Sequence, residues 1–121
     1  LDVSDGCLDE FRHFEPEKKY TRNLIATDNE RFTLMLICWN GGKESPIHDH
    51  PCRGCWMRVV EGAVVETRFD RRGGALVETG RGEFSSPAVA YVHDSMGLHK
   101  VGAAPGCERA CTLHLYAPPC D

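Results

Sequence analysis

The stretch Gly42-Lys-Glu-Ser-Pro-Ile-His48-Asp-His50-Pro-Cys-Arg-Gly-Cys55-Trp-Met-Arg-Val-Val-Glu-Gly62 decides how this chain is interpreted. Its two histidines, His48 and His50, are two residues apart. Successive side chains of a β-strand point to opposite faces, so on a strand both imidazoles would lie on one face. A third imidazole is available at His99, just after a glycine turn. The sequence therefore predicts a metal centre on these three histidines.

The rest of the chain is typical of short strands separated by turn residues. The expected strands are 20–25, 32–39, 47–50, 55–60, 63–69, 75–79, 89–92, 99–103 and 110–116. Residues 7–13 predict a short helix, and Glu61-Gly62 predicts a two-residue hairpin turn. So many short strands with so little helix indicate an all-β protein that closes into a sandwich or barrel.

Length and charge exclude several functional classes. With 121 residues we expect one domain over 1–121, and a monomer. The net charge of −4 argues against nucleic acid as a partner, because phosphate binding needs clustered basic residues. The longest apolar run, Leu34–Trp39, is too short to span a bilayer, so no membrane partner is expected. Because the chain begins with Leu1 rather than Met, we expect a fragment or a processed form.

The chain has seven cysteines, an odd number that cannot all pair internally. Several have apolar neighbours, as Cys38 does, which favours reduced thiols in a cytoplasmic protein over a secreted disulfide scaffold.

The cysteines leave a structural zinc site as an alternative. Cys52 and Cys55 form a C-x-x-C pair, and Cys107 and Cys111 follow downstream. Zinc prefers thiolates in closed tetrahedral sites. The downstream spacing is C-x-x-x-C, however, which weakens this interpretation.

The spacing of Gly42, His48, His50 and Gly62, with a further histidine some fifty residues on, resembles the two motifs of the cupin family. The resemblance implies a small double-stranded β-barrel, or jelly roll, with a metal in its mouth. Most cupins have a glutamate ligand where this chain has Cys55. Three imidazoles alone give a neutral site, which favours an anionic incoming ligand such as a thiolate, but imidazole suits iron, zinc, copper and nickel alike.

Longer runs are similar to one family. They are Tyr20-Thr-Arg22-Asn-Leu, Ile47-His-Asp-His50, Tyr91-Val-His-Asp-Ser-Met-Gly-Leu-His99 and Leu113-His-Leu-Tyr116-Ala-Pro-Pro119. Together they resemble cysteine dioxygenase, from about Lys19 to the C-terminus. The resemblance implies an enzyme that binds non-haem Fe(II) and adds both atoms of O2 to the sulfur of free L-cysteine, giving cysteine sulfinic acid.

The resemblance also implies a role for each matching residue. The iron ligands would be His48, His50 and His99; the substrate carboxylate would be held by Arg22, with Tyr20 beside it; and His114, Tyr116 and Cys55 would lie near the iron. In some family members the cysteine at the position of Cys55 is joined to the tyrosine by a thioether bond. Arginine has a planar fork suited to a carboxylate, which agrees with this assignment.

The chain departs from the family in three respects. Thr112 stands where the family often has serine, and His93 replaces a usual asparagine. The family continues past Asp121 and has a longer N-terminal helical region, so we expect sequence to be missing at both ends.

Two other functions stay open at this point. A sister thiol dioxygenase would act on 3-mercaptopropionate or cysteamine, although Arg22 favours a substrate with a carboxylate. A cupin that binds metal without catalysis is the alternative from another class.

Overall fold

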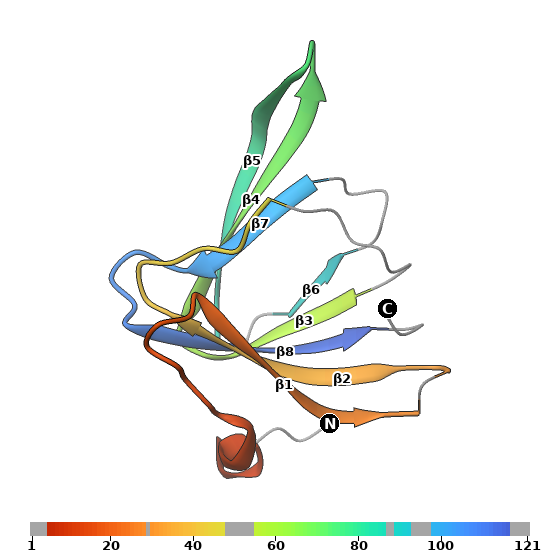
Figure 1. Ribbon diagram of the computed structural model, residues 1–121, viewed down its shortest axis with the longest axis vertical. Coiled ribbons are helices and arrows are strands. Elements are labelled where there is room, and N and C mark those ends of the chain that lie inside the picture. The colour runs from red at the N-terminus through yellow and green to blue at the C-terminus, as the bar shows by residue number, and fades with distance from the viewer. Residues whose placement is uncertain (1–4, 29, 48–54, 87–88, 93–97, 117–121) are drawn as a thin grey trace.

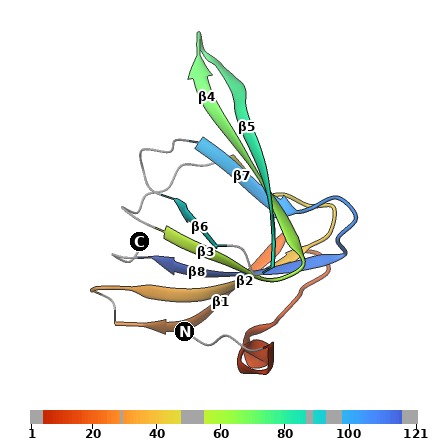
Figure 2. The same ribbon diagram turned by 180° about the vertical axis from the view of Figure 1, so that it is seen from behind.

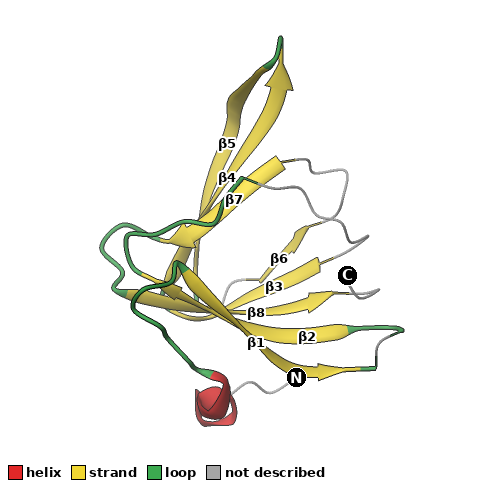
Figure 3. Ribbon diagram, in the orientation of Figure 1, coloured by secondary structure: helices red, strands yellow, loops and turns green. Residues whose placement is uncertain are grey.

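The computed structural model describes residues 5–28, 30–47, 55–86, 89–92 and 98–116. One 3-10 helix, η1 (Asp5–Phe11), precedes the strands. The strands are β1 (Tyr20–Thr27), β2 (Thr33–Asn40), β3 (Cys55–Glu61), β4 (Ala63–Arg72), β5 (Ala75–Ser85), β6 (Val89–Val92), β7 (Leu98–Ala103) and β8 (Arg109–Tyr116). The prediction of an all-β chain with little helix is confirmed (Figure 3).

The strands form two antiparallel sheets. One has five strands in the order β1-β2-β8-β3-β6, and the other has three in the order β5-β4-β7. Figure 1 shows the sheets meeting along one side and diverging on the other, where β3 and β7 begin and β8 ends. The same arrangement is seen from behind in Figure 2. The ends of these three strands therefore lie on the open side of the molecule.

Strand β2 is buried along nearly its whole length, as its continuous apolar sequence predicts. One face carries Met35, Ile37 and Trp39, which pack in the cluster between the two sheets. The other face carries Leu36 and Cys38, which pack in a second cluster. This second cluster includes Leu8 of η1, so the helix covers the outer face of the larger sheet.

Cross-strand register identifies which side chains share the interior face. On the larger sheet Ile37 is opposite Thr112, and Met35 is opposite His114. On the smaller sheet Val64 and Val101 belong to the same interior cluster as Met35 and Ile37. Side chains two residues along from any of these point the same way. Glu66 and His99 therefore face the interior from the smaller sheet.

Gly62 does not form the expected hairpin. Its φ of 70° permits a sharp turn, but β3 pairs with β6 and β8, whereas β4 pairs with β5 and β7. A Cβ atom at Gly62 would lie 2.7 Å from the carbonyl oxygen of Arg109. This turn passes the chain from one sheet to the other, close against the start of β8, and the hairpin prediction was wrong.

Other differences concern the ends of elements. Strands β4 and β5 are longer than predicted and form a hairpin that projects beyond the rest of the barrel, with Gly73 and Gly74 at its tip (Figure 1). Ile47, expected to begin a strand, is not in one, and Glu44 instead makes an isolated bridge to Gly102. No helix in the described ranges is long and apolar enough to cross a membrane.

Candidate functional site

His99 is held on the interior face by a carboxylate. It is the second residue of β7, and its side chain is buried. Its Nδ1 atom lies 2.9 Å from Oε2 of Glu66 on β4. A carboxylate accepts hydrogen bonds only, so Nδ1 is the nitrogen that carries hydrogen. That tautomer leaves the lone pair on Nε2, as a metal ligand requires.

Glu66 was not among the residues predicted from the sequence. It is buried on β4, where burial of a carboxylate is costly unless charged or polar groups surround it. Besides His99 it has a second neighbour, since its Oε1 atom lies 3.8 Å from Nε of Arg68. The sequence held a signal for this residue: an acid two positions after Val64 shares the face of a buried valine.

A second buried histidine faces the interior from the larger sheet. Nε2 of His114 lies 2.7 Å from Oγ1 of Thr112. That hydroxyl oxygen also accepts the indole N–H of Trp39 at 2.8 Å. With the oxygen already accepting from Trp39, the threonine proton is available for His114 Nε2. This network favours the tautomer with hydrogen on Nδ1, which lies 3.5 Å from the hydroxyl of Tyr116.

Tyr116 ends this line of polar contacts. It is buried, and its ring stacks on that of His114 with centroids 5.9 Å apart. An Nδ1–H on His114 would donate to the Tyr116 oxygen, so the tyrosine proton is left to point elsewhere. The line Trp39, Thr112, His114, Tyr116 fixes the phenol at the open end of β8.

Cys55 is the cross-strand partner of Tyr116. The two residues are paired in the β3–β8 register, as the first residue of β3 and the last of β8. The sequence prediction that these two residues are close is consistent with this register.

Arg22 shares its strand face with Tyr20 but differs from it in burial. Tyr20 packs on Trp39 with ring centroids 4.8 Å apart. Arg22 is opposite Ile37, on the interior face, yet it is exposed. Solvent therefore reaches this part of the interior face. Within the described ranges no acidic side chain pairs with its guanidinium.

His48 and His50, the other two predicted metal ligands, lie outside the described residues. Of the three predicted ligands, the structure therefore places His99. Among the residues that are described, no group of three or more histidine, cysteine or acidic side chains is arranged to hold a metal.

The zinc alternative does not agree with the register of β3 and β8. Cys55 is opposite Tyr116, whereas Cys111 is opposite Glu61 at the other end of the same strand pair. Five residues of strand separate these positions by about 17 Å. Cys111 instead contacts Cys38 on the outer face of the larger sheet. One tetrahedral site cannot include both Cys55 and Cys111.

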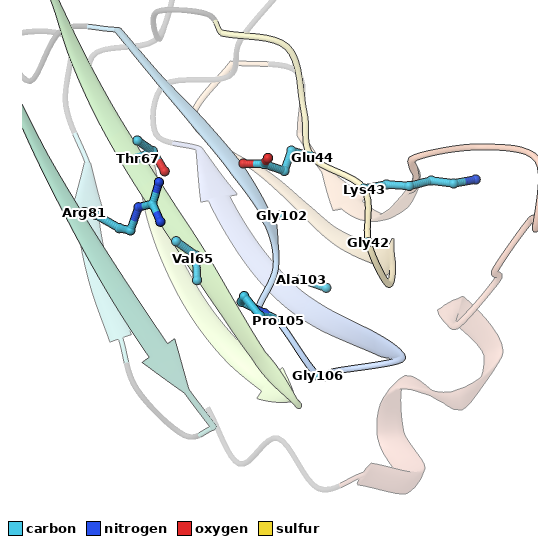
Figure 4. Close-up of a pocket in the computed structure, with 10 residues that line it drawn as sticks. All are labelled: Gly42, Lys43, Glu44, Val65, Thr67, Arg81, Gly102, Ala103, Pro105 and Gly106. Atoms are coloured by element: carbon cyan, nitrogen blue, oxygen red, sulfur yellow. The ribbon is translucent and has the colours of Figure 1, made fainter. Parts of the chain in front are cut away.

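A pocket of about 310 Å³ lies elsewhere, on the outer face of the smaller sheet. Figure 4 shows Val65, Thr67 and Arg81 on one side of it and Glu44 and Lys43 on the other. None of the predicted site residues that the structure describes lines this pocket. The pocket is therefore separate from the interior face that carries His99 and His114.

Two antiparallel sheets packed face to face, with buried histidines on the interior face of each, define a small double-stranded β-barrel of the cupin type. Solved structures share this fold. A cupin superfamily protein from Desulfitobacterium hafniense matches with a TM-score of 0.64 and 14% identity, over 87% of this chain and 83% of that chain. A Klebsiella pneumoniae protein with a double-stranded beta-helix domain matches with a TM-score of 0.69 and 16% identity, over 92% and 81%.

The chain belongs to the cysteine dioxygenase type I family. The family profile described as "Cysteine dioxygenase type I" matches residues 5–121. Cysteine dioxygenase type 1 of Homo sapiens is 39% identical over 106 residues, which cover 85% of this chain and 53% of the relative. The chain thus spans about half the length of the curated relatives that it matches.

Proposed function

We propose that this chain carries the catalytic barrel of a thiol dioxygenase that converts free L-cysteine and O2 into cysteine sulfinic acid. The observation that carries the proposal is the interior face itself: His99, oriented by Glu66, lies on one sheet, and His114 and Tyr116 lie on the other. Family membership supports the same reaction.

Fe(II) is the proposed cofactor, with His48, His50 and His99 as its ligands. The Glu66 carboxylate supports this role for His99, because metal-ligating histidines commonly donate their other ring N–H to a carboxylate. When bound, the iron would acidify the substrate thiol and bring the thiolate and O2 together.

Arg22 and Tyr20 are proposed to bind the substrate's carboxylate. An exposed guanidinium on the interior face can form a bidentate pair with a carboxylate that enters from solvent. Tyr20 is fixed by its contact with Trp39, so its position does not depend on substrate. This pair would orient the amino acid with its sulfur toward the histidines.

Tyr116 is proposed to hold a proton next to the reacting sulfur and oxygen. Its hydroxyl oxygen lies 3.5 Å from His114 Nδ1, from which it would accept a hydrogen bond, and the phenolic O–H can donate to a bound substrate. Thr112 keeps His114 in the required tautomer through the contact with Nε2. His114 and Thr112 are thus positioning residues for the phenol.

A thioether bond between Cys55 and Tyr116 is also proposed. The two residues are opposite each other in the β3–β8 register, which supports the bond. Such a bond removes two hydrogen atoms and survives reduction with dithiothreitol. Peptide mapping after digestion should find the linkage in the wild-type chain and not in Tyr116→Phe. Linear Cys55 and Tyr116 peptides alone, after turnover with Fe(II) and L-cysteine, would reject the thioether.

The proposed reaction is tested by oxygen uptake and sulfinate detection with the Fe(II)-loaded chain and L-cysteine. We expect consumption of O2 with one sulfinate formed for each O2. Iron binding without thiol-dependent oxygen uptake would overturn the enzyme assignment and favour a metal-binding cupin without catalysis.

A substrate panel separates the related thiol dioxygenases. L-cysteine and 3-mercaptopropionate both have a carboxylate, and cysteamine has none. We expect Arg22→Ala to raise KM about tenfold for the two carboxylates and to leave cysteamine unaffected. Arg22→Lys keeps the charge without the planar fork and should give an intermediate KM. An unchanged KM for L-cysteine in Arg22→Ala would reject the role of Arg22.

A further inference from the structure

Two cysteines that the proposed reaction does not use face each other on the outer side of the barrel. Cys38 of β2 and Cys111 of β8 are directly opposite in the register, and both side chains are fully buried. Their sulfur atoms are 3.8 Å apart, and both are free thiols. Residues opposite each other on antiparallel strands have Cα atoms about 4.5–5.5 Å apart, within the range that a disulfide spans.

The surroundings distinguish the two thiols. The Sγ atom of Cys38 accepts hydrogen bonds from Cys111 Sγ at 3.8 Å and from Asn23 Nδ2 at 3.7 Å. The hydrogen bond from Cys111 lowers the pKa of the Cys38 thiol, whereas burial raises it. The positive charge of Arg12 also lowers this pKa. Donating that bond, together with burial and the negative charge of Glu61, raises the pKa of Cys111. Because both Asn23 and Cys111 donate hydrogen bonds to its sulfur, we take Cys38 as the attacking thiol of the pair and Cys111 as the resolving thiol.

In the described part of the chain, the pair is covered by η1, a 3-10 helix of seven residues, and by the residues that follow it. Leu8 packs on the cysteines, and the thiol of Cys38 lies 3.8 Å from the carbonyl oxygen of Phe11. Segments with few buried contacts open locally at a lower free-energy cost than the paired strands of a core. Such opening admits a small oxidant to the outer face while the two sheets stay paired.

We propose that Cys38 and Cys111 form a peroxide-responsive dithiol site, in which hydrogen peroxide oxidises Cys38 and Cys111 then closes a cross-strand disulfide. In the first step the Cys38 sulfur attacks one peroxide oxygen, the O–O bond breaks, and sulfenic acid and water form. In the second step the Cys111 sulfur attacks the Cys38 sulfur, the S–O bond breaks, and a second water leaves. Overall, two thiols and one hydrogen peroxide give one disulfide and two water molecules.

The two cysteines lie on the outer face of β2 and β8, directly behind the hydrogen-bond network on the interior face of the same strands. Trp39 follows Cys38, and Thr112 follows Cys111, so these neighbours point to the opposite face of the same two strands. There the Trp39 indole N–H donates to Thr112 Oγ1 at 2.8 Å. A covalent link between the sulfur atoms would hold β2 and β8 together directly behind this hydrogen bond.

Peptide mapping of the folded chain tests the proposal. The reduced wild-type chain is treated with hydrogen peroxide, the remaining thiols are alkylated, and the digest is analysed with and without dithiothreitol. We expect a linked peptide pair containing Cys38 and Cys111, lighter by two hydrogen atoms and separated again by dithiothreitol. This reversal distinguishes it from a thioether, so the result does not depend on the proposed enzyme activity.

Single variants test the order of the two steps. In Cys111→Ser the sulfenic acid on Cys38 should persist and be trapped by dimedone, whereas in Cys38→Ser no sulfenic acid should form on Cys111. Cys107→Ser is the matched control, because Cys107 lies outside the pair and is partly exposed; its disulfide yield should equal that of the wild type. Free thiols at Cys38 and Cys111 while Cys107 is oxidised, or either cysteine linked to a different partner, would overturn the proposal.

Discussion

Two of the described histidines are buried, one on each sheet, and their partners differ in kind. His99 on the smaller sheet is held through Nδ1 by the Glu66 carboxylate. His114 on the larger sheet is held through Nε2 by the Thr112 hydroxyl. A carboxylate strengthens an imidazole as a ligand and favours positive charge near it, whereas a hydroxyl only orients the ring. These different partners agree with the roles proposed for the two histidines, metal binding for His99 and positioning of the phenol for His114.

The largest effect is expected from His99→Gln. Glutamine can still hydrogen-bond to Glu66, but it removes one of the three proposed metal ligands. We expect loss of bound iron and of cysteine-dependent oxygen uptake, measured by iron content per chain and an oxygen electrode. The exposed His13 gives the control His13→Gln, which should bind iron like the wild type. If His99→Gln contained as much iron per chain as the wild type, His99 would not be a metal ligand and the proposed difference between the two histidines would be rejected.

Glu66→Gln tests the carboxylate itself. The amide still accepts a hydrogen bond from His99 Nδ1 but carries no charge. We expect an iron affinity about 10- to 100-fold weaker, measured by chelator competition. Glu78→Gln on β5 removes a half-exposed carboxylate far along the hairpin and should leave the affinity unchanged. Equal affinities for the two variants would show that the Glu66 charge does not support the metal.

His114→Gln should give the opposite pattern to His99→Gln. We expect normal iron content with kcat for L-cysteine lower by about tenfold, equivalent to about 1.4 kcal/mol, because the Tyr116 hydroxyl loses its oriented partner. Iron analysis and oxygen uptake on one preparation measure both quantities. Loss of iron from this variant would place His114 among the metal ligands instead.

Thr112→Val should have the smallest effect on the site and a clear effect on stability. Valine keeps the shape but leaves the buried indole N–H of Trp39 without its acceptor. We expect the free energy of unfolding to fall by about 1–3 kcal/mol, measured by urea denaturation. Thr112→Ser keeps the hydroxyl and separates this loss from that of a methyl group. A fully stable Thr112→Val chain would show that the network does not hold the ring of Trp39.

The sequence predicted strand burial and shared strand faces correctly wherever these follow from the pattern of apolar residues. The continuous apolar run of β2 predicts a strand buried on both faces, and alternation in β8 places His114 and Tyr116 on one face. Both predictions are confirmed because strand geometry fixes which side chains share a face. The same alternation places Thr112 on this face, whereas Cys55 could be related to Tyr116 only through the β3–β8 register, which a sequence does not state.

Three features depend on tertiary structure that sequence patterns do not contain. Glu61-Gly62 is typical of a hairpin turn, but β3 and β4 pair with strands of different sheets, so the turn connects the two sheets instead. Arg22 is on the interior face yet exposed, which depends on where the sheets diverge. The contact of Glu66 with His99 forms only because β4 pairs with β7, and this pairing could not be predicted from the sequence. His48 and His50 stay predictions, since they lie outside the described residues.

The long hairpin of β4 and β5 has a consequence for how the protein behaves at high concentration. Among the described strands β5 lies at an edge of its sheet, so one side of its backbone can pair with another molecule. Leu76 and Val77 are exposed near its tip, but Glu78, Arg81 and Glu83 follow along the strand. Charged side chains on an edge strand disfavour its pairing with another molecule, so we expect these three residues to oppose fibril-like stacking.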